Sequence, residues 1–469
     1  MPSHSDQLVR WMTTLRLEDL PEDVVESTKL RVLDIIGLAL ASSVLDYGRA
    51  VRESVLEMSL STGTARILGF GDPVPPMFAA FANGALAEGF LYSDTHNETL
   101  THVSAPVVAT AFALGEHTNA SGADVLTAIA GGNELICRMG CVAPGAFHRG
   151  GFHPTGVIGA LGATFVACKM LGLDMDRSRH AIGIAGSQAA GLNEALSDGT
   201  WTTMMHPGWA AHCGIAAALL AKNGFTGPAT VLEGRFGVFR AHVQDPAYQF
   251  DFDRMLGKLG RDWESRYISF KPYPCAHVLH SFIDALLHLH QHEGLRPDKV
   301  KRITCPIAQY MVPLVAEPRH EKLNPQTYLQ VRTSLPMVLA EALHFGKVDF
   351  RSFSARTIQN KEILALAQLI THVIDPDAPG SWQYKGWVVV ETTDGTTLER
   401  IEEHNRGSAD NPLSVSDLAV KFQENCTVAL PNKVDAIIDA VIGLDQMPTI
   451  HELIDHATRV DARRRVTGR

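Results

Sequence analysis

Apolar residues recur at helical spacing through most of the first 240 residues. Residues 21–44 are typical, because Leu33, Ile36 and Leu40 share one helical face and Pro21 suits the first turn of a helix. The same pattern predicts seven further helices, over residues 76–90, 105–117, 121–139, 156–171, 177–191, 207–223 and 228–232. Ala and Gly are frequent inside these segments, and small residues allow helix axes to approach closely. This half therefore predicts a dense helical bundle.

The pattern changes in the second half of the chain. Residues 299–306 alternate apolar and polar positions as a strand does, and residues 387–401 form two β-rich runs joined by Asp394-Gly395, a strong hairpin signal. Helices are predicted over residues 277–292 and 331–344. Strands and helices mixed in this way indicate a smaller α+β domain.

Three more helices are predicted at the chain end, over residues 414–425, 432–444 and 449–455, and we expect them to pack on the helical domain. The fold class is therefore mainly α with α+β. A large all-helical domain is built from both chain ends, and a smaller α+β domain is inserted into it. The boundaries that we predict are residues 1–266 and 406–469 for the helical domain and residues 267–405 for the inserted one.

Charge and apolar run length exclude two classes of partner. The 469 residues carry a formal net charge of −10, from 41 basic and 51 acidic side chains, which argues against a nucleic-acid partner. The one basic run, residues 459–465, is interpreted as a solvated helix end. The longest apolar stretches fall short of the ~20 residues that a membrane span needs, so we expect no membrane partner.

Cysteine usage indicates the compartment. The seven cysteines are odd in number, scattered, and mostly set among Ala, Gly and Ile, as reduced buried thiols are. The first residues are polar and lack the apolar core of a signal peptide. We therefore expect a cytoplasmic protein.

Four short polar clusters contain residues suited to acid–base chemistry. They occupy turns at helix or domain boundaries, where a pocket draws its polar groups, and their central side chains are His102, His153, His206 and Lys271. A histidine titrates near neutrality and can both accept and donate a proton. Each histidine taken alone is more often structural, but four clusters of one chemical type favour a catalytic site.

Other chemistries fit the sequence less well. The Gly-rich run at residues 183–191 lacks a preceding strand, and no Gly-Lys-Ser/Thr follows a Gly-rich turn, which argues against dinucleotide and P-loop sites. The histidines of residues 275–280 and 288–292 match no known zinc spacing. Gly-x-Ser-x-Gly is absent, so a Ser-His-Asp hydrolase is disfavoured. We expect neither a metal nor an organic cofactor.

Several motifs, taken in order, are typical of one protein family. They are Asp94-Thr95-His96, His102-Val103-Ser104-Ala105-Pro106, His153-Pro154-Thr155-Gly156, His206-Pro207-Gly208-Trp209, Leu232-Glu233-Gly234-Arg235-Phe236-Gly237, Lys271-Pro272-Tyr273-Pro274-Cys275 and Asn411-Pro412-Leu413-Ser414. Each motif is weak alone, but the ordered set covers nearly the whole chain. It resembles the MmgE/PrpD family, which includes 2-methylcitrate dehydratase, cis-aconitate decarboxylase and iminodisuccinate epimerase.

The resemblance implies an inserted α+β lid, a site in the cleft beneath it, and a homodimer. It also implies cofactor-free removal or delivery of a proton at a carbon next to a carboxylate, which needs a base, an acid and a cationic donor. By position, His102 and His153 would be the acid–base pair, and Lys271 would bind the carboxylate or stabilise developing charge. Asp94 and Thr95 would orient a histidine or the substrate.

The chain departs from the family pattern at several positions. Leu91 and Ser93 stand where relatives keep acids, and Glu88 stands where a histidine is common. A lysine common just before the His-Pro-Gly cluster is Thr203 here, and the tyrosine of Ser-Leu-Pro-Tyr is Met337. A charged hydrogen bond to a carboxylate contributes roughly 1.5–3 kcal/mol. Loss of that cation predicts a substrate with fewer carboxylates than cis-aconitate or 2-methylcitrate, or with a neutral group in place of one.

The predicted catalytic residues are His102, His153, Lys271 and Asp94. Those predicted to contact the substrate are Thr95, His96, Thr203, His206, His277 and Met337. We expect His96 to supply part of the function lost at the departures.

The sequence thus predicts a cofactor-free lyase or isomerase, dehydratase-like or epimerase-like, that acts on a small carboxylic acid. Epimerisation needs no leaving group and so tolerates the departures, whereas family prevalence favours a lyase, and both stay open. The alternative is a non-catalytic or small-ligand-binding relative. The retained His102, His153 and Lys271 count against it.

Overall fold

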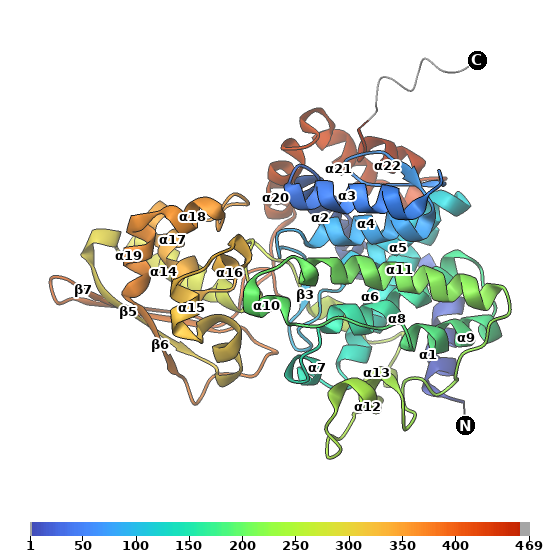
Figure 1. The fold of residues 1–469 in the computed structure, drawn as a ribbon, viewed down its shortest axis with the longest axis horizontal. Coiled ribbons are helices and arrows are strands. Elements are labelled where there is room, and N and C mark those ends of the chain that lie inside the picture. The colour runs from blue at the N-terminus through green and yellow to red at the C-terminus, as the bar shows by residue number, and fades with distance from the viewer. Residues whose placement is uncertain (1, 460–469) are drawn as a thin grey trace.

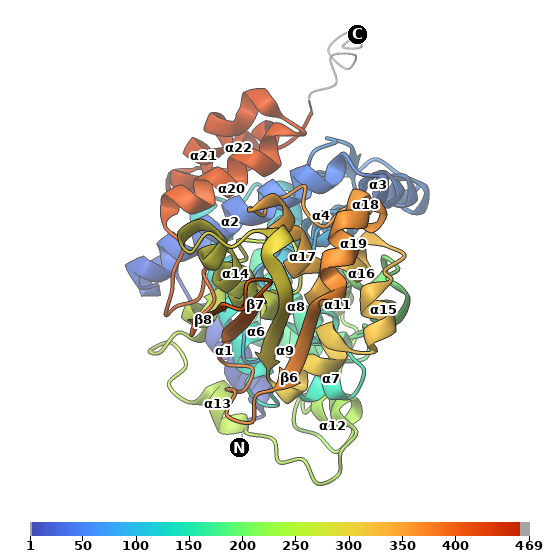
Figure 2. The ribbon, with the colours of Figure 1, turned by 90° about the vertical axis from the view of Figure 1, so that its left-hand side faces the viewer.

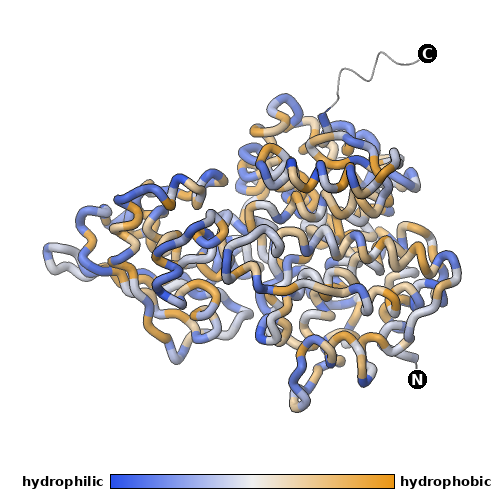
Figure 3. The backbone as a smooth tube through the Cα atoms, in the orientation of Figure 1, coloured by the Kyte–Doolittle hydropathy of each residue, from blue (hydrophilic) through white to orange (hydrophobic). Residues whose placement is uncertain are grey.

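The computed structural model describes residues 2–459 and has a large and a small lobe (Figure 1). Helices dominate, and the few strands form small sheets, so the predicted class, mainly α with α+β, is confirmed. Each lobe has its own hydrophobic core, and hydrophobic segments run through both (Figure 3). No helix in the described residues is long and apolar enough to cross a membrane.

Six long helices form the centre of the large lobe: α2 Glu22–Ser43, α4 Pro76–Glu88, α5 Ser104–Thr118, α6 Gly122–Gly140, α8 Pro154–Met170 and α11 Thr202–Lys222. Helix α11 packs against both α8 and α4. The α4–α11 contact requires glycine, because a Cβ added to Gly208 would lie 2.2 Å from the backbone oxygen of Phe81, and one added to Gly84 would lie 2.8 Å from the Gly208 backbone. The small residues thus allow the close packing that the sequence predicts.

Shorter elements cover this centre. They are α1 His4–Thr14, α3 Asp46–Ser59, α7 Ala146–Arg149, α9 Met175–Gly186, α10 Ala195–Asp198, α12 Val238–Val243 and α13 Phe252–Leu256, with the strand pairs β1 Ala65–Arg66 and β2 Pro73–Val74, and β3 Thr95–His96 and β4 Ile268–Ser269. Strands β3 and β4 pair antiparallel, with Thr95 opposite Ser269. This short pair joins the loop after α4 to the start of the small lobe.

The chain end returns to the first helices, as the sequence predicts. Helices α20 Val415–Thr427, α21 Val434–Ile442 and α22 His451–His456 lie beside α2 and α3 in Figure 1, and α20 and α21 contact α2. A buried ion pair joins α20 to α2, with Lys421 Nζ 2.7 Å from Asp34 Oδ1. Lys421 also donates a hydrogen bond to the backbone oxygen of Tyr92, so the returning helix contacts the segment that precedes β3.

The small lobe is a four-stranded sheet with helices packed on it, and Figure 2 views it from its outer end. The strand order is β6-β5-β7-β8, with β5 parallel to β6 and antiparallel to β7. Strands β7 and β8 form the hairpin predicted around Asp394-Gly395. The elements of this lobe are α14 His280–His292, β5 Val300–Ile307, α15 Arg319–Leu323, α16 Tyr328–Arg332, α17 Leu335–Phe345, α18 Ala355–Gln359, α19 Lys361–Gln368, β6 Ile370–Ile374, β7 Gly386–Thr392 and β8 Thr397–Glu402.

The structure corrects several sequence predictions. Residues 228–232 form turns rather than a helix, because Gly227 and Pro228 pack tightly against α9. Helix α9 ends at Gly186, short of residue 191, and α11 begins at Thr202, so Pro207 lies inside it. Strand β6 was not predicted. The basic run at residues 459–465 falls almost wholly outside the described residues, and Arg459 itself is not helical.

Candidate active site

A pocket opens between the two lobes where the polar clusters meet. Residues of the large lobe form one wall, and residues of the small lobe form the other. Much of the lining is leucine, valine and alanine, with a few polar groups converging on the space. The polar lining residues are Thr95, His102, His148, His153, Asn193, Thr203, Lys271, His277, Thr333 and Tyr384.

His102 is held with one ring nitrogen fixed and the other free. Its Nδ1 lies 3.0 Å from the backbone oxygen of Asp94 and 3.2 Å from Thr95 Oγ1. A carbonyl oxygen can only accept, so Nδ1 carries the proton and Nε2 keeps its lone pair. Burial lowers the pKa of His102 well below its ordinary value, and Lys271 acts in the same direction. The ring is therefore neutral and suited to accept a proton.

A fully buried carboxyl lies behind His102. Glu88 ends helix α4, has no exposed surface, and places Oε1 3.8 Å from His102 Nε2. Its other oxygen accepts a hydrogen bond from Ser93. Burial raises the pKa of Glu88 to about 7, although the Lys271 ammonium opposes this shift. Sequence reasoning noted Glu88 as a departure from the family and did not include it in the site.

Lys271 supplies a cation to the pocket. It is buried, and Nζ donates a hydrogen bond of 2.9 Å to the backbone oxygen of Leu91. Leu91 has a φ of 54°, a backbone conformation that is unfavourable for leucine. This conformation directs the Leu91 carbonyl toward the lysine. Burial lowers the pKa of Lys271 to about 8, although the Glu88 carboxyl acts in the opposite direction.

His153 and His206 form a pair at the start of helix α8. His153 is the N-cap of that helix, and its Nδ1 lies 2.9 Å from Nδ1 of His206. One of these nitrogens carries the proton of the hydrogen bond and the other accepts it. Burial lowers the pKa of both histidines, to about 4 for His206, and the helix N-terminus also disfavours a charged ring. The rings of His102 and His153 are 5.6 Å apart.

Three more predicted residues line the pocket. Thr95 contacts His102, as described above, and Thr203 lies in the first turn of α11 with its hydroxyl buried and without a partner in the described residues. His277 comes from the small lobe, where its Nε2 bonds Asn405 at 3.0 Å. His277 Nδ1 is likewise buried without a partner in the part of the chain described. Thr203 and His277 thus leave polar atoms free for a ligand.

The other predicted residues do not line the pocket. The Asp94 carboxylate is paired with Arg31 and with Ser104, so its contribution to the site is the backbone oxygen that fixes His102. His206 lies behind His153. His96 follows Thr95 on a strand and therefore faces the opposite way, toward Glu264.

Met337 is also away from the pocket. It lies in the first turns of α17, with no exposed surface, in the core of the small lobe. The N-cap at Ser334 sets this direction, because its side chain bonds the Met337 backbone N–H.

Four polar lining residues were missed entirely, namely His148, Asn193, Thr333 and Tyr384. His148 lies on the short helix α7, and Tyr384 precedes β7. Burial lowers the pKa of His148 to about 4. No motif marks His148 or Tyr384, although His148 stands only five positions before His153, a signal that sequence reasoning could have used.

The family comparison covers both lobes. Residues 6–251 match the MmgE/PrpD N-terminal domain, and residues 273–446 match the MmgE/PrpD C-terminal domain. The chain belongs to the MmgE/PrpD family. The resemblance drawn from the ordered motifs is thereby confirmed.

Several curated relatives carry one activity in their names. A cis-aconitate decarboxylase of Aspergillus terreus is 25% identical over 96% of this chain and 95% of its own length. The cis-aconitate decarboxylases of Mus musculus and Homo sapiens are each 28% identical over 92% of this chain, and over 89% and 90% of their own lengths. The match thus spans nearly the whole of both partners at low identity.

Proposed function

We propose that this chain is a cofactor-free enzyme of the lyase type that acts on a small carboxylic acid. In this proposal a proton is removed from, or delivered to, the carbon next to a carboxylate. The main observation that supports this proposal is that neutral His102, neutral His153 and the cation of Lys271 line one pocket. The curated relatives are named as decarboxylases, which are lyases, and this supports the same class.

The pocket supplies the parts that such a step needs. One N–H group of Lys271 Nζ donates to the backbone oxygen of Leu91. The remaining N–H groups bind the substrate carboxylate and stabilise the negative charge that develops on it. His102 Nε2, with its lone pair free, takes the proton. The bound carboxylate and the histidine must then lie on either side of the reacting carbon.

The acid comes from Glu88 or His153. Because its pKa is about 7, Glu88 is protonated in a sizeable fraction of molecules near neutrality, and it can protonate His102 Nε2, which then donates that proton to the substrate carbon. His153 exchanges its proton with His206 across the 2.9 Å contact, so it can return a proton from the other side of the pocket. Both routes use groups that are already in place.

The charges of the pocket favour a substrate with few carboxylates. Lys271 is the one lysine or arginine among the described residues that line the pocket. Burial lowers the pKa of each lining histidine, so these rings are neutral, and Glu88 behind them adds no positive charge. A tricarboxylate such as cis-aconitate would leave carboxylates without a cation against an apolar wall, which is costly. We therefore propose a substrate with one carboxylate, or with two of which one stays in solvent.

An isomerase is the second candidate. Two neutral imidazoles lie 5.6 Å apart in the pocket, and epimerisation needs one base on each face of the carbon and no leaving group. This arrangement favours an epimerase-like reaction, while the named relatives favour the lyase.

The discriminating experiment is proton exchange in heavy water. The purified protein is incubated with a panel of mono-, di- and tricarboxylates, and the C–H signals are followed by NMR. A new alkene or loss of CO2 indicates the lyase, and exchange with inversion but without a new product indicates the isomerase. If no compound of the panel shows exchange or conversion, both enzymatic proposals are wrong, and the chain is a relative that only binds a small ligand.

We also propose the arrangement in which the enzyme works. Residues 267–405 act as a lid over the site, since the small lobe supplies Lys271, His277 and Tyr384 to the pocket. The seven cysteines are all buried and free, which suits a reducing cytoplasm, and the family resemblance favours a homodimer. Sedimentation of the purified protein at twice the mass of the chain is the expected result.

A further inference from the structure

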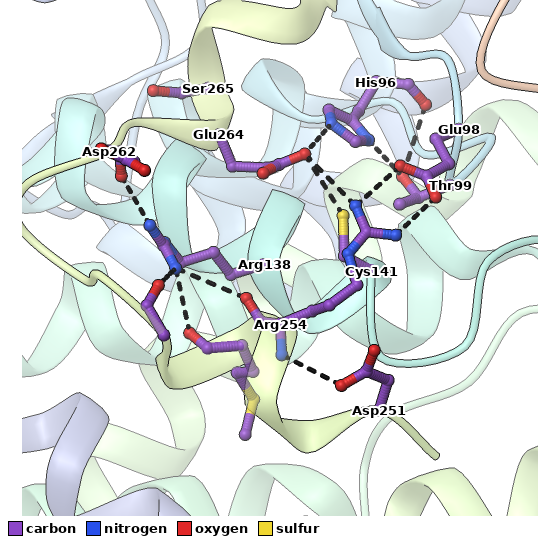
Figure 4. A network of polar contacts seen from close by, with 12 residues as sticks. His96, Glu98, Thr99, Arg138, Cys141, Asp251, Arg254, Asp262, Glu264 and Ser265 are labelled. Carbon is purple, nitrogen blue, oxygen red and sulfur yellow. Dashed lines mark hydrogen bonds and ion pairs between the residues drawn. The ribbon is translucent and has the colours of Figure 1, made fainter. Parts of the chain in front are cut away.

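A second group of side chains lies away from the pocket, on the other face of β3. It consists of His96, Cys141 and Glu264, whose potential ligand atoms all lie within 4.8 Å of one another (Figure 4). These residues come from β3, from the residue after α6, and from the segment before β4. They are the one such group of histidine, cysteine and acidic side chains found in the described part of the chain.

Two of the distances between these atoms match the edges of a metal coordination shell. His96 Nε2 lies 3.4 Å from Glu264 Oε1, and Cys141 Sγ lies 3.5 Å from the same oxygen. Tetrahedral Zn²⁺ with ordinary bond lengths separates nitrogen from oxygen by about 3.3 Å and sulfur from oxygen by about 3.5 Å. An ion can therefore enter with little movement of the side chains.

His96 is oriented as a ligand. Its Nδ1 contacts Thr99 Oγ1 at 3.1 Å, and that hydroxyl donates its own hydrogen to the His96 backbone oxygen. Nδ1 must then be the protonated nitrogen, which leaves the lone pair of Nε2 directed at the cluster. Nε2 is buried, and apart from the Glu264 carboxylate 3.4 Å away it has no partner among the residues that the structure describes. A buried polar atom without a partner is costly unless something binds it.

Glu264 is also held in place. Its backbone N–H donates to Glu134 Oε1 at 3.1 Å, and the next N–H donates to Oε2 of the same residue at 2.8 Å. The guanidinium of Arg254 makes both its short contacts with Glu98 and approaches Glu264 only to 3.8 Å. A divalent ion with one thiolate and one carboxylate would leave the group neutral, beside a neutral Arg254–Glu98 pair.

A path for entry exists. A surface pocket lined by His96, Glu98, Arg254 and Glu264 reaches the group, and about a quarter of the Glu264 side chain is exposed there. This side leaves room for water as a fourth ligand. Sequence reasoning expected no metal, and this site is not one it could find, because its ligands are 45 and 123 residues apart along the chain.

From this geometry we infer that His96, Cys141 and Glu264 form a binding site for a divalent transition metal, with Zn²⁺ the ion that best fits a nitrogen, sulfur and oxygen donor set. Binding releases the thiol proton of Cys141 to solvent and forms a metal–sulfur bond. The ion would join β3, α6 and the segment leading to Lys271, and thereby brace the wall of the pocket that holds Thr95. It takes no part in the proposed proton transfer.

The test uses the full-length protein after treatment with a chelator, and Co²⁺ as a spectroscopic probe. We expect one equivalent of Co²⁺ to give a thiolate-to-cobalt absorption band that Zn²⁺ then abolishes. Cys141→Ser should lose the band, whereas Cys137→Ser, four residues earlier in the last turn of α6 and also buried, should keep it. Zn²⁺ should raise the Tm of the wild type and of Cys137→Ser, but not of Cys141→Ser.

Two results would overturn the inference. One is the absence of both a Co²⁺ band and a Zn²⁺-dependent rise in Tm in the wild type. The other is an equal band in Cys141→Ser and Cys137→Ser. If Cys141→Ser does not fold, Glu264→Gln replaces it and must weaken Zn²⁺ binding by about tenfold or more. Since none of these readouts uses turnover, their failure leaves the proposed enzymatic function untouched.

Discussion

The Nε2 atom of His102 lies 3.8 Å from Oε1 of Glu88, and that carboxyl is fully buried. The contact joins the proposed base to an acid whose pKa burial raises to about 7. In the family pattern a histidine is common at position 88, so the buried carboxyl of Glu88 is a departure of this chain. One of the two proposed proton routes depends on this carboxyl.

Glu88→Gln should change the pH dependence of turnover. If Glu88 supplies a proton, wild-type kcat falls as the pH rises through about 7, because the carboxyl then loses its proton. The variant cannot ionise at this position, so we expect its kcat to be lower, by about tenfold or more, and flat across that range. Glu341→Gln, a buried carboxyl in the small lobe, is the control and should keep the wild-type profile. An unchanged fall in Glu88→Gln would remove Glu88 from the mechanism.

The same substitution should alter stability in a pH-dependent way. The pKa of Glu88 is raised from 4.5 to about 7 on folding, so the folded protein binds the proton more tightly than the unfolded chain. Wild-type stability contributed by this group is therefore present below pH 4.5 and is lost as the pH rises to about 7. In urea unfolding, the free energy of unfolding of Glu88→Gln should rise relative to that of the wild type by roughly 1–3 kcal/mol as the pH goes from 4.5 to 8. A difference that does not vary with pH would contradict the shift.

Thr203→Lys tests the proposal that the substrate has few carboxylates. Thr203 lines the pocket with its hydroxyl unpaired among the described residues, and the family resemblance implies a lysine at this position. A new cation should strengthen tricarboxylate binding by about tenfold to a hundredfold, measured by calorimetry. Thr202→Lys, on the exposed side of the same helical turn, is the control. If tricarboxylate affinity rises equally in both variants, the effect of the added charge is general, and the proposed role of position 203 in limiting the number of carboxylates is wrong.

Gly208→Ala should destabilise the large lobe. The added Cβ would lie 2.2 Å from the backbone oxygen of Phe81. Relieving this clash would require the backbones of α4 and α11 to move apart, which costs free energy. We expect a loss of about 1–3 kcal/mol in the free energy of unfolding, as overpacked cores show. Gly443→Ala is the matched control, because its Cβ would meet nothing closer than 3.4 Å. A loss no greater than that of the control would mean that the helices α4 and α11 adjust freely.

Much of the fold could be predicted because its signals are local. Helical periodicity located α2, α4, α5, α6 and α8, and the Asp394-Gly395 turn located the β7–β8 hairpin. Strand β6 has no turn of this kind and pairs in parallel with a strand far back in the sequence, so its partner lies outside any local window. The turns at residues 228–232 arise from packing against α9, which a periodicity count does not include.

Some residues of the candidate site could be predicted from the sequence, and others could not. His102, His153 and Lys271 meet in one pocket because each stands in a turn at the end of an element. The direction of a side chain within an element is harder to predict, as His96 and Met337 show, since one residue along a strand or one turn along a helix decides which face it takes. Glu88 was missed as a member of the site because its pKa depends on burial, which the sequence does not state.

The central claim is that His102 removes a proton from a carbon next to a carboxylate. The most direct measurement is the rate of C–H exchange in heavy water for the best substrate of the panel, in the wild type and in His102→Gln, with exposed His292→Gln as the control. We predict that His102→Gln slows exchange by about a hundredfold or more while His292→Gln matches the wild type. Exchange at the wild-type rate in His102→Gln would contradict the account.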